Sequence, residues 1–246
     1  MDKIYGINPV KVFLENGNIG LKKIYVAPGR GGTAIKEIVE IARQKEIAIS
    51  IRQRSELDKI AGNSNHQGVV GIYDSYLYKD IDVLINNRGE QSEFNLIIIL
   101  DSVMDPQNLG AIIRSAYCFG ANGLIIPKDR AAAVTSAVIK ASAGSANQLP
   151  VCRITNLSQV IDFLKSRGFW VFGAQARGGE NLRSLDFRCH VALILGGEAK
   201  GIRPLLRKKC DFLVTIPITG QFDSFNVAVA AGIIQYEIFC QQGRTG

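Results

Sequence analysis

The chain has 246 residues, of which 47% are hydrophobic and 21% charged, and its formal net charge at pH 7 is +7. That length suffices for one large hydrophobic core or two small ones, whereas no apolar run approaches the roughly 20 residues of a membrane-spanning helix. The N-terminus has no basic segment followed by an apolar one, so no signal peptide is expected. The excess positive charge favours a polyanionic partner such as a nucleic acid, although solubility alone would also explain it.

The cysteines and histidines exclude two further classes. Five cysteines form no CxxC pair and are odd in number, which is typical of reduced thiols in a cytoplasmic protein and not of a disulfide framework. His66 and His190 are the only histidines, which excludes a histidine-rich metal site. No metal is expected in the chemistry.

Residues 1–76 predict a small α/β domain. Asn8-Pro9 is typical of a helix start, with an N-cap and a proline at the first helical position, and Gly17 can end that helix. Apolar residues at helical spacing predict a longer helix from Thr33 to Lys45. The remaining predicted elements are strands at 22–27, 47–51 and 69–73 and a short helix at 55–61.

This first domain carries basic side chains, some of them next to strand ends where they could contact phosphates; the alternative is an ordinary solvated face. They include Lys22, Lys23, Arg30, Arg52 and Arg54. His66, in the polar loop 63–68, either contacts RNA or caps the turn.

Residues 77–92 show no strong periodicity and are expected to be a linker with at most one helical turn. From residue 93 to 246, strands alternate with helices, which predicts a parallel sheet covered by helices on both faces. The expected strands are 96–100, 123–126, 170–172, 191–195 and 212–216, and the expected helices run from Asp105-Pro106 to Gly120, from 134 to 143, from 157 to 167 and from 224 to 240.

The first polar segment with potential chemistry follows the strand at 96–100. Asn108 is expected in the first helical turn, facing the strand ends, and Gly110 allows a backbone to approach. Arg114 lies among apolar residues of the same helix. A buried or half-buried arginine there would need an anion as partner; the alternative is a side chain that extends to solvent.

Two further segments begin as apolar strands and break into small and polar residues, at 193–201 and 215–232. We expect their strands to be neighbours, with a ligand between their carboxyl ends. The glycines of the turn 196–201 follow a buried strand and would let a cofactor lie against the main chain. The turn contains Glu198, so it is neither GxGxxG nor a P-loop, although a plain tight turn remains an alternative. Ser224 is a candidate N-cap for the last helix, and Asn226 is expected in its first turn.

Together the three segments resemble the signature motifs of the SpoU (TrmH) class of SPOUT methyltransferases. Asn108-Leu-Gly-Ala-Ile-Ile-Arg114 matches Asn-x-Gly-x-x-x-Arg, and the glycine turn through Glu198 to Gly201 matches Gly-x-Glu-x-x-Gly. Ile216-Pro-Ile-Thr-Gly, followed by Ser224-Phe-Asn-Val-Ala-Val-Ala, is similar to the third motif. The spacing of the motifs agrees over about 150 residues, which makes the resemblance far more specific than any single motif.

Residues 1–76 resemble the substrate-binding domain of that family. The segments 4–10, 66–68 and 127–130 are similar to the RlmB subgroup, which methylates a guanosine ribose in large-subunit (23S) ribosomal RNA. Phe225, Ile218 and Ala228 stand where the family usually has Leu, Met and Ser, and Asn147 where relatives often have Glu. Phe225 and Ile218 alter the shape expected for the adenine pocket without removing its main-chain contacts.

The resemblance implies a cofactor, S-adenosylmethionine, with S-adenosylhomocysteine as product, and it assigns residues to two roles. The cofactor-binding residues would be Gly196, Gly197, Gly201, Ile216, Ile218, Phe225 and Asn226. Arg114 would lie nearest the ribose and stabilise the developing alkoxide, and Asn108, Glu198, Ser224 and Asn226 would order it and the RNA.

The resemblance also implies a deep trefoil knot in the C-terminal domain and a homodimer formed through the last helix. The expected function is methyl transfer to a ribose 2′-hydroxyl of ribosomal RNA. A transfer RNA substrate, and a non-catalytic RNA-binding protein with the same fold, remain alternatives. Glu198 in the glycine turn disfavours a dinucleotide-binding enzyme.

Overall fold

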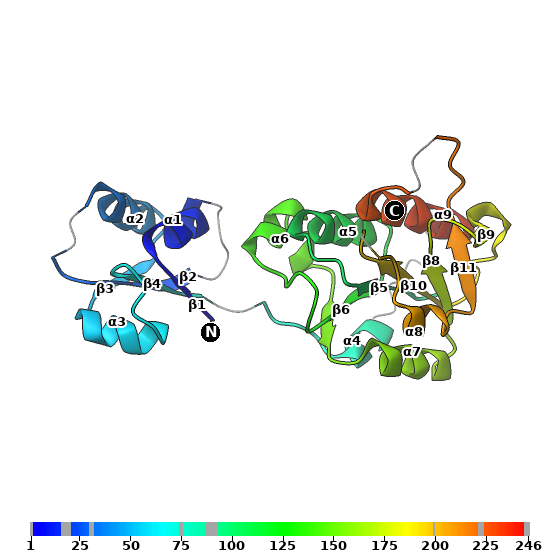
Figure 1. Ribbon diagram of the computed structural model, residues 1–246, viewed down its shortest axis with the longest axis horizontal. Helices are drawn as coiled ribbons and strands as arrows, with labels where there is room; N and C mark the ends of the chain where they lie inside the picture. Colours follow the sequence, from blue (N-terminus) through cyan, green and yellow to red (C-terminus); the bar gives the residue numbers. More distant parts are fainter. Residues whose placement is uncertain are drawn as a thin grey trace. The chain divides into compact units, whose positions relative to one another are not determined.

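The computed structural model describes residues 2–15, 21–29, 32–73, 76–86, 93–198, 200–220 and 224–243. Its chain divides into two compact units, Met1–Leu77 and Tyr78–Gly246, each with its own sheet (Figure 1). Among the helices described, none combines the length and the apolar character that crossing a membrane requires.

The first unit has a four-stranded sheet in the order β1-β4-β2-β3, in which β2 and β3 are parallel and β4 is antiparallel to both of its neighbours. Helices α1 and α2 cover one face and α3 covers the other (Figure 1). Its elements are β1 (Asp2–Tyr5), α1 (Ile7–Glu15), β2 (Leu21–Val26), α2 (Thr33–Gln44), β3 (Ala48–Ile51), α3 (Arg54–Ala61) and β4 (Val69–Tyr73).

The main elements predicted for this unit are present, with two differences. Strand β1 was not predicted, because four residues before a glycine carry too little periodicity. Helix α1 begins at Ile7, so Asn8 lies inside the helix and is not its N-cap. Gly17 lies outside the described residues.

The second unit has a seven-stranded sheet in the order β7-β6-β5-β10-β8-β11-β9, and every pair of neighbouring strands in it is parallel. Its elements are α4 (Ile81–Asn86), β5 (Leu96–Asp101), α5 (Pro106–Cys118), β6 (Gly123–Pro127), α6 (Ser136–Ala141), η1 (Ser145–Asn147), β7 (Val151–Ile154), α7 (Leu157–Ser166), β8 (Trp170–Ala174), β9 (Glu180–Asn181), η2 (Leu182–Ser184), β10 (Val191–Gly196), α8 (Pro204–Arg207), β11 (Phe212–Thr215) and α9 (Val227–Gln241).

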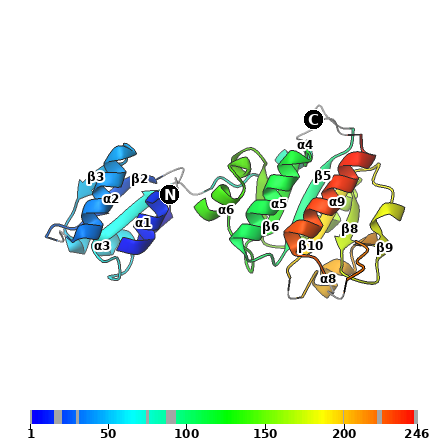
Figure 2. The same ribbon diagram turned by 90° about the horizontal axis from the view of Figure 1, so that it is seen from above.

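Helices cover both faces of this sheet, as the strand–helix alternation predicted. Helices α5, α6 and α9 lie on one face, and α4, α7 and α8 lie on the other (Figures 1 and 2). The central strand β5 is buried along its whole length, which explains its continuous apolar run. Strands β7 and β9 and helix α8 were not predicted, because each is only two to four residues long.

The stretch expected as a linker contains more structure than predicted. Helix α4 packs its buried Leu84 into the core of the second unit, and the Asn95 side chain donates a hydrogen bond to the Ile85 carbonyl (2.9 Å). The sequence showed one apolar patch here, which is the buried side of this helix. Residues 87–92 lie outside the described part of the chain.

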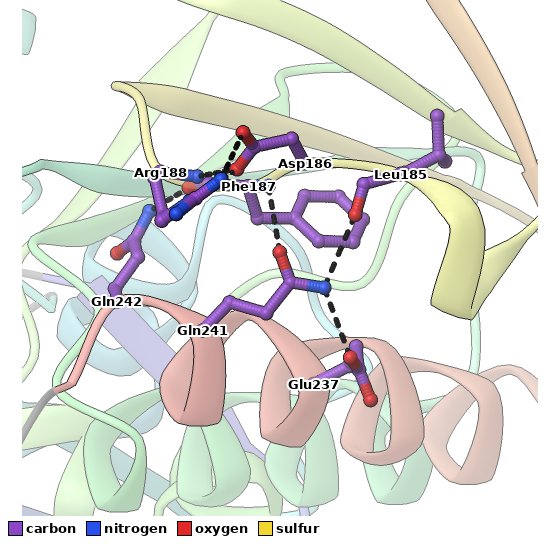
Figure 3. A network of polar contacts seen from close by, with 7 residues as sticks. All are labelled: Leu185, Asp186, Phe187, Arg188, Glu237, Gln241 and Gln242. Atoms are coloured by element: carbon purple, nitrogen blue, oxygen red, sulfur yellow. Dashed lines mark hydrogen bonds and ion pairs between the residues drawn. The ribbon is translucent and has the colours of Figure 1, made fainter.

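The end of α9 is tied to the chain segment that precedes β10 (Figure 3). The Gln241 side chain donates to the Leu185 carbonyl (3.1 Å) and accepts from the Phe187 N–H (2.9 Å). The Gln242 side chain donates to the carbonyls of Phe187 (2.7 Å) and Cys189 (2.9 Å). These bonds fix the C-terminal end of α9 and so help to set where its N-terminal end lies.

Candidate functional site

A cavity of about 390 Å³ opens at the carboxyl ends of β10, β8 and β11. The prediction that β10 and β11 are neighbours was wrong, since β8 lies between them. Residues 174–177, which end β8 and continue beyond it, therefore also line the cavity, and they had not been predicted. The predicted strand at 170–172 was the available signal, because parallel neighbours end at the same edge of a sheet.

All but one of the residues expected to hold a cofactor line this one cavity. They are Gly196, Gly197, Gly201, Ile216, Ile218 and Phe225, and Glu198 and Ser224 line it with them. Asn226 is not among the lining residues, although it directly follows Phe225. The volume is within the range of small-molecule sites, which are mostly apolar with a few polar groups.

Three polar side chains, one from each sequence motif, meet beside the cavity. The Nδ2 of Asn108 donates to Oε1 of Glu198 (2.9 Å). The Nδ2 of Asn226 lies within hydrogen-bond distance of the same Glu198 oxygen (2.7 Å) and of Oδ1 of Asn108 (3.0 Å). The predicted convergence of distant segments is thus present for these three residues, which lie 90 and 28 positions apart along the chain.

Asn226, and not Ser224, caps the last helix. Its Oδ1 accepts from the N–H groups of Ala228 (2.9 Å) and Val229 (3.4 Å), and α9 begins at the next residue, Val227. The predicted cap at Ser224 was wrong, since the helix starts three residues later than expected. One side chain therefore has two functions: its oxygen caps α9, and its nitrogen bonds to Glu198.

The glycines of the 196–201 turn have a different physical reason from the one expected. A Cβ on Gly196 would lie closer than 3.0 Å to backbone atoms of Gly201 and Ile202, and a Cβ on Gly197 equally close to the Ser102 carbonyl oxygen. The glycines are thus required by close approach of the chain to itself. Of the three glycines, only Gly201 is required by its backbone conformation. Its φ is +61°, in the left-handed region, and no described atom lies within 4 Å of a Cβ built there.

An ion pair between the buried Asp101 and the partly exposed Arg203 fixes this turn to the end of β5, and it was not predicted. Asp101 is fully buried; its Oδ1 accepts from Nε of Arg203 (2.7 Å) and its Oδ2 from the Arg203 backbone N–H (2.8 Å). The Asp101 carbonyl also accepts from the Gly197 N–H (2.8 Å). Because the two residues are 102 positions apart, no local pattern could have paired them.

Within a single chain, the side chain of Arg114 makes no hydrogen bond or ion pair with Asn108, Glu198 or Asn226. It does not line the cavity, its side chain is exposed, and it has no hydrogen bond or ion pair with any residue in the described ranges. The predicted alternative of a buried or half-buried Arg114 was wrong, and the alternative of a side chain that extends to solvent is confirmed. Its exposure leaves the guanidinium available to a ligand or to a second chain.

In the first unit, His66 has a structural role. It is fully buried, its Nδ1 accepts from the Gly68 N–H (3.0 Å), and its Nε2 lies 3.0 Å from Oδ1 of Asp58. It therefore caps the turn, one of the two predicted alternatives. Lys22, Arg52 and Arg54 are exposed, whereas Arg30 lies outside the described residues.

The cysteines nearest the sheet are poor candidates for covalent chemistry. Burial raises the pKa of the thiols of Cys152, Cys189 and Cys210 to about 11 in each case. Such thiols stay protonated near neutral pH, and the thiolate is the nucleophilic form. The described part of the chain also contains no group of three or more His, Cys, Asp or Glu side chains that could hold a metal ion.

We expect that two replacements of Asn226 will separate its two functions. Asn226→Ser keeps a good helix cap but loses the bond to Glu198, so the melting temperature should change little while activity falls at least tenfold. Asn226→Ala loses both, and stability should also fall by about 1 kcal/mol. Thermal denaturation and a methyl-transfer assay check this; equal stability of the two variants, or full activity of the serine variant, would contradict it.

The second unit has a parallel sheet, a cavity at the carboxyl ends of its strands, and a cluster of two amides and one carboxylate beside that cavity. This arrangement is typical of α/β proteins that bind a nucleotide-like ligand beyond the strand ends. The SpoU rRNA methylase family model matches residues 95–236, and a model for an RNA 2′-O ribose methyltransferase substrate-binding domain matches residues 3–79. The chain belongs to the SpoU family.

Close relatives support this assignment over the whole chain. A Bacillus subtilis protein provisionally named as a TrmH family tRNA/rRNA methyltransferase is 37% identical over 245 residues, covering 100% of this chain and 98% of the relative. A Staphylococcus aureus protein with the same provisional name is 38% identical over 243 residues, covering 99% and 97%.

Two solved structures share the fold. The SpoU methyltransferase AviRb of Streptomyces viridochromogenes, solved in complex with S-adenosylmethionine, is 26% identical with a TM-score of 0.62, covering 97% of this chain and 89% of AviRb. The A. aeolicus TrmH/SpoU tRNA modifying enzyme is 28% identical with a TM-score of 0.57, covering 65% of this chain and 79% of that enzyme.

Proposed function

We propose that this protein transfers a methyl group from S-adenosylmethionine to a ribose 2′-hydroxyl, in a guanosine of large-subunit ribosomal RNA. The observation that carries the proposal is the meeting of Asn108, Glu198 and Asn226 beside a cavity lined by the predicted cofactor residues. Capping of α9 accounts for the oxygen of Asn226 but not for the convergence of Asn108, Glu198 and the Asn226 nitrogen at the rim of the cavity. The cluster therefore argues against a non-catalytic RNA-binding protein.

The cavity fits the proposed cofactor in size and chemistry. Apolar side chains of Ile216, Ile218 and Phe225 line it and suit the flat faces of a purine, while the glycine turn offers main-chain polar groups. Gln175 and Arg177 add polar side chains at the end of β8. When bound there, S-adenosylmethionine would supply a methyl group on a positively charged sulfur.

The reacting hydroxyl is a weak nucleophile, so the protein must orient it and stabilise the negative charge that develops on its oxygen. A guanidinium stays protonated near neutral pH and has no acceptor atom, so Arg114 is better suited to stabilise an alkoxide than to remove a proton. We propose that Arg114 does this and that the proton passes to a neighbouring group or to water. The side chains of Asn108 and Asn226 both bond to Glu198, and this contact holds the three motifs in their positions relative to one another.

Transfer RNA is the alternative substrate. The provisional names of the relatives cover both kinds of RNA, and one structural neighbour is a tRNA modifying enzyme. The positive charge of the chain supports a folded RNA but does not distinguish the two. In line with such a substrate, and with the absence of paired cysteines in the sequence, we propose a cytoplasmic location.

A homodimer through α9 is part of the proposal. This helix has apolar side chains on several sides, and Glu237 is its one charged residue, which is more apolar than a surface helix usually is. Val229 and Tyr236 on it are nevertheless 49% and 55% exposed, and Tyr117 on the neighbouring helix α5 is 49% exposed. A second copy of the chain covering this face would bury all three and would lie next to Arg114.

The interface gives a direct prediction. Val229→Glu places a charge in the proposed contact and should convert the dimer into a monomer, because an unpaired charge is expensive to bury. Leu205→Glu, a change at another exposed apolar residue (63% exposed) outside α9, is the matched control and should stay dimeric. Sedimentation velocity checks both; a dimer that survives Val229→Glu would locate the interface elsewhere.

The trefoil knot also remains a prediction. The sheet order agrees with it, since β10 lies between β5 and β8, which both precede it in the chain.

The decisive test of the activity is to map 2′-O-methyl groups in ribosomal and transfer RNA from cells with and without the protein. Loss of one mark in large-subunit RNA is expected, and loss of a mark in transfer RNA would select the alternative. If no mark disappears and the purified protein methylates neither RNA, the proposed function is wrong. Stabilisation against heat by S-adenosylhomocysteine tests the cofactor separately.

A further inference from the structure

We propose that Met104 and the turn 128–130 form a second RNA contact on the catalytic unit, which holds a nucleotide adjacent to the one that is methylated. The proposal rests on the proposed function. It assigns a phosphate contact to Arg130 and Lys128 and an apolar contact with a base to Met104. None of these residues belongs to the cavity or to the Asn108–Glu198–Asn226 cluster.

The segment from Lys128 to Val134, which contains the turn, is hydrogen-bonded to its surroundings at three points. Nη2 of Arg153 donates to the Lys128 carbonyl (2.8 Å), and the Ala132 N–H donates to the Val103 carbonyl (2.9 Å). The Val134 N–H donates to the Tyr78 hydroxyl (2.9 Å). The bond to Val103 fixes the turn after β6 to the loop after β5, which carries Met104 as its next residue.

Arg130 is held in a costly conformation with no internal compensation. Its φ is +57°, in the left-handed region that residues other than glycine rarely adopt. Its side chain is exposed and has no hydrogen bond or ion pair with the residues that the structure describes. Such strain is commonly found where a backbone conformation serves binding; here it presents a guanidinium to solvent beside the exposed Lys128.

Met104 adds an exposed apolar side chain on the loop to which this segment is bonded. It is 70% exposed, on the loop between β5 and the N-cap of α5. A single exposed apolar residue needs no explanation by itself. Together with the two cations at the end of the neighbouring strand, it gives the combination that binds single-stranded RNA: positive charge for the backbone and a polarisable thioether for an aromatic face.

The position relative to the active site supports a nucleotide as occupant. Strands β6, β5 and β10 are consecutive in the sheet, and their carboxyl ends carry Arg130, Met104 and Glu198 in that order. Neighbouring strands are about 5 Å apart, so the turn lies about two strand spacings from the glycine turn. Around the proposed contact, Lys128, Arg130 and Arg153 contribute three cations against the two carboxylates of Asp129 and Asp105. This excess of positive charge favours a polyanion over a protein partner.

The test compares Arg130→Gly, Arg130→Lys, Met104→Ala and Met104→Leu in the full-length protein. Arg130→Gly removes the guanidinium and fits the left-handed turn without strain, so the variant should fold at least as well as the wild type. Arg167→Ala, a loss of one exposed arginine just before β8 at the opposite edge of the sheet, is the matched control. The probes are unmodified transcripts of large-subunit ribosomal RNA and of transfer RNA, whichever the wild type methylates.

Arg130→Gly should weaken RNA binding and raise the KM for RNA by about tenfold, and the slope of log affinity against log salt should shrink by about 0.7, the value for one phosphate contact on a single strand. Arg130→Lys should keep that slope. Met104→Ala should weaken binding about two- to tenfold without changing the slope, and Met104→Leu should restore much of the loss.

Binding of S-adenosylhomocysteine should be unchanged in all four variants, which separates this contact from the cofactor site. Wild-type RNA affinity and salt slope in Arg130→Gly would overturn the inference while leaving the proposed function intact. The same losses in Arg167→Ala would also overturn it, because they would show a general charge effect. Failure of the wild type to methylate either RNA would overturn the proposed function and this inference with it.

Discussion

Replacing Arg114 with Lys should abolish methyl transfer, with kcat at least a hundredfold lower, while the affinity for S-adenosylhomocysteine stays within about twofold of the wild type. Lysine keeps the positive charge but lacks the planar fork that can bridge a developing alkoxide and a phosphate oxygen at once. A loss of this size is typical for one donor that stabilises charge in a transition state.

The structure explains why binding and chemistry should separate in this variant. Arg114 is exposed, lies outside the cavity lining and bonds to no described residue, so its replacement removes nothing that holds the cofactor or the fold. Calorimetric titration with S-adenosylhomocysteine and single-turnover methylation measure the two quantities. Arg167→Lys, at the other edge of the sheet, is the control. Substantial activity in Arg114→Lys would assign the stabilisation of the ribose oxygen to another residue.

Gly196→Ala should have the largest effect on the cofactor site. The added Cβ would lie closer than 3.0 Å to the backbone of Gly201 and Ile202. Backbone atoms cannot rotate away as a flexible side chain can, so the whole turn must shift. Overpacking of this kind costs about 3 kcal/mol, which corresponds to a fall of about 6–12 °C in melting temperature, and the distorted cavity should bind S-adenosylhomocysteine at least tenfold more weakly.

Gly220→Ala is the matched control for this change. No atom of the described residues lies within 4 Å of a Cβ at that position, and its backbone is outside the left-handed region, so stability and cofactor affinity should stay close to those of the wild type. Differential scanning calorimetry with and without S-adenosylhomocysteine compares the two variants. A normal melting temperature in Gly196→Ala would mean that the turn is free to move, in spite of the Asp101–Arg203 pair at its base.

The alternation of strands and helices in the second unit was predictable because periodicity is a local property. Buried strands such as β5 read as apolar runs, and the Asp105-Pro106 start of α5 is present as expected, with the Asp105 side chain accepting from the Gln107 N–H (3.0 Å). Elements of two to four residues escaped prediction, because so few side chains establish no period. The last helix was predicted to start too early, since both Ser224 and Asn226 are good caps.

The functional cluster was predictable only through the motifs. Asn108, Glu198 and Asn226 have no local feature that brings them together, and their shared contact depends on three chain segments. The reason for Gly196 was misread, because a sequence does not reveal whether a missing side chain makes room for a ligand or for the chain itself. The fully buried Asp101 and its bond to Arg203 were not foreseen at all.

What the sequence determined by itself was local or compositional: the alternation of elements, the Asp105 cap of α5, the positive charge and the identity of the motif residues. Only the tertiary structure decided that β8 lies between β10 and β11, that Asn226 caps α9 while bonding to Glu198, and that Arg114 faces outward. The physical reason is the range of the interactions. Helix and strand periods arise between residues a few positions apart. Sheet order and the contacts of Asn108 with Glu198 and of Asp101 with Arg203 instead join residues from distant parts of the chain, 90 and 102 positions apart in these two contacts, which meet only in the folded chain.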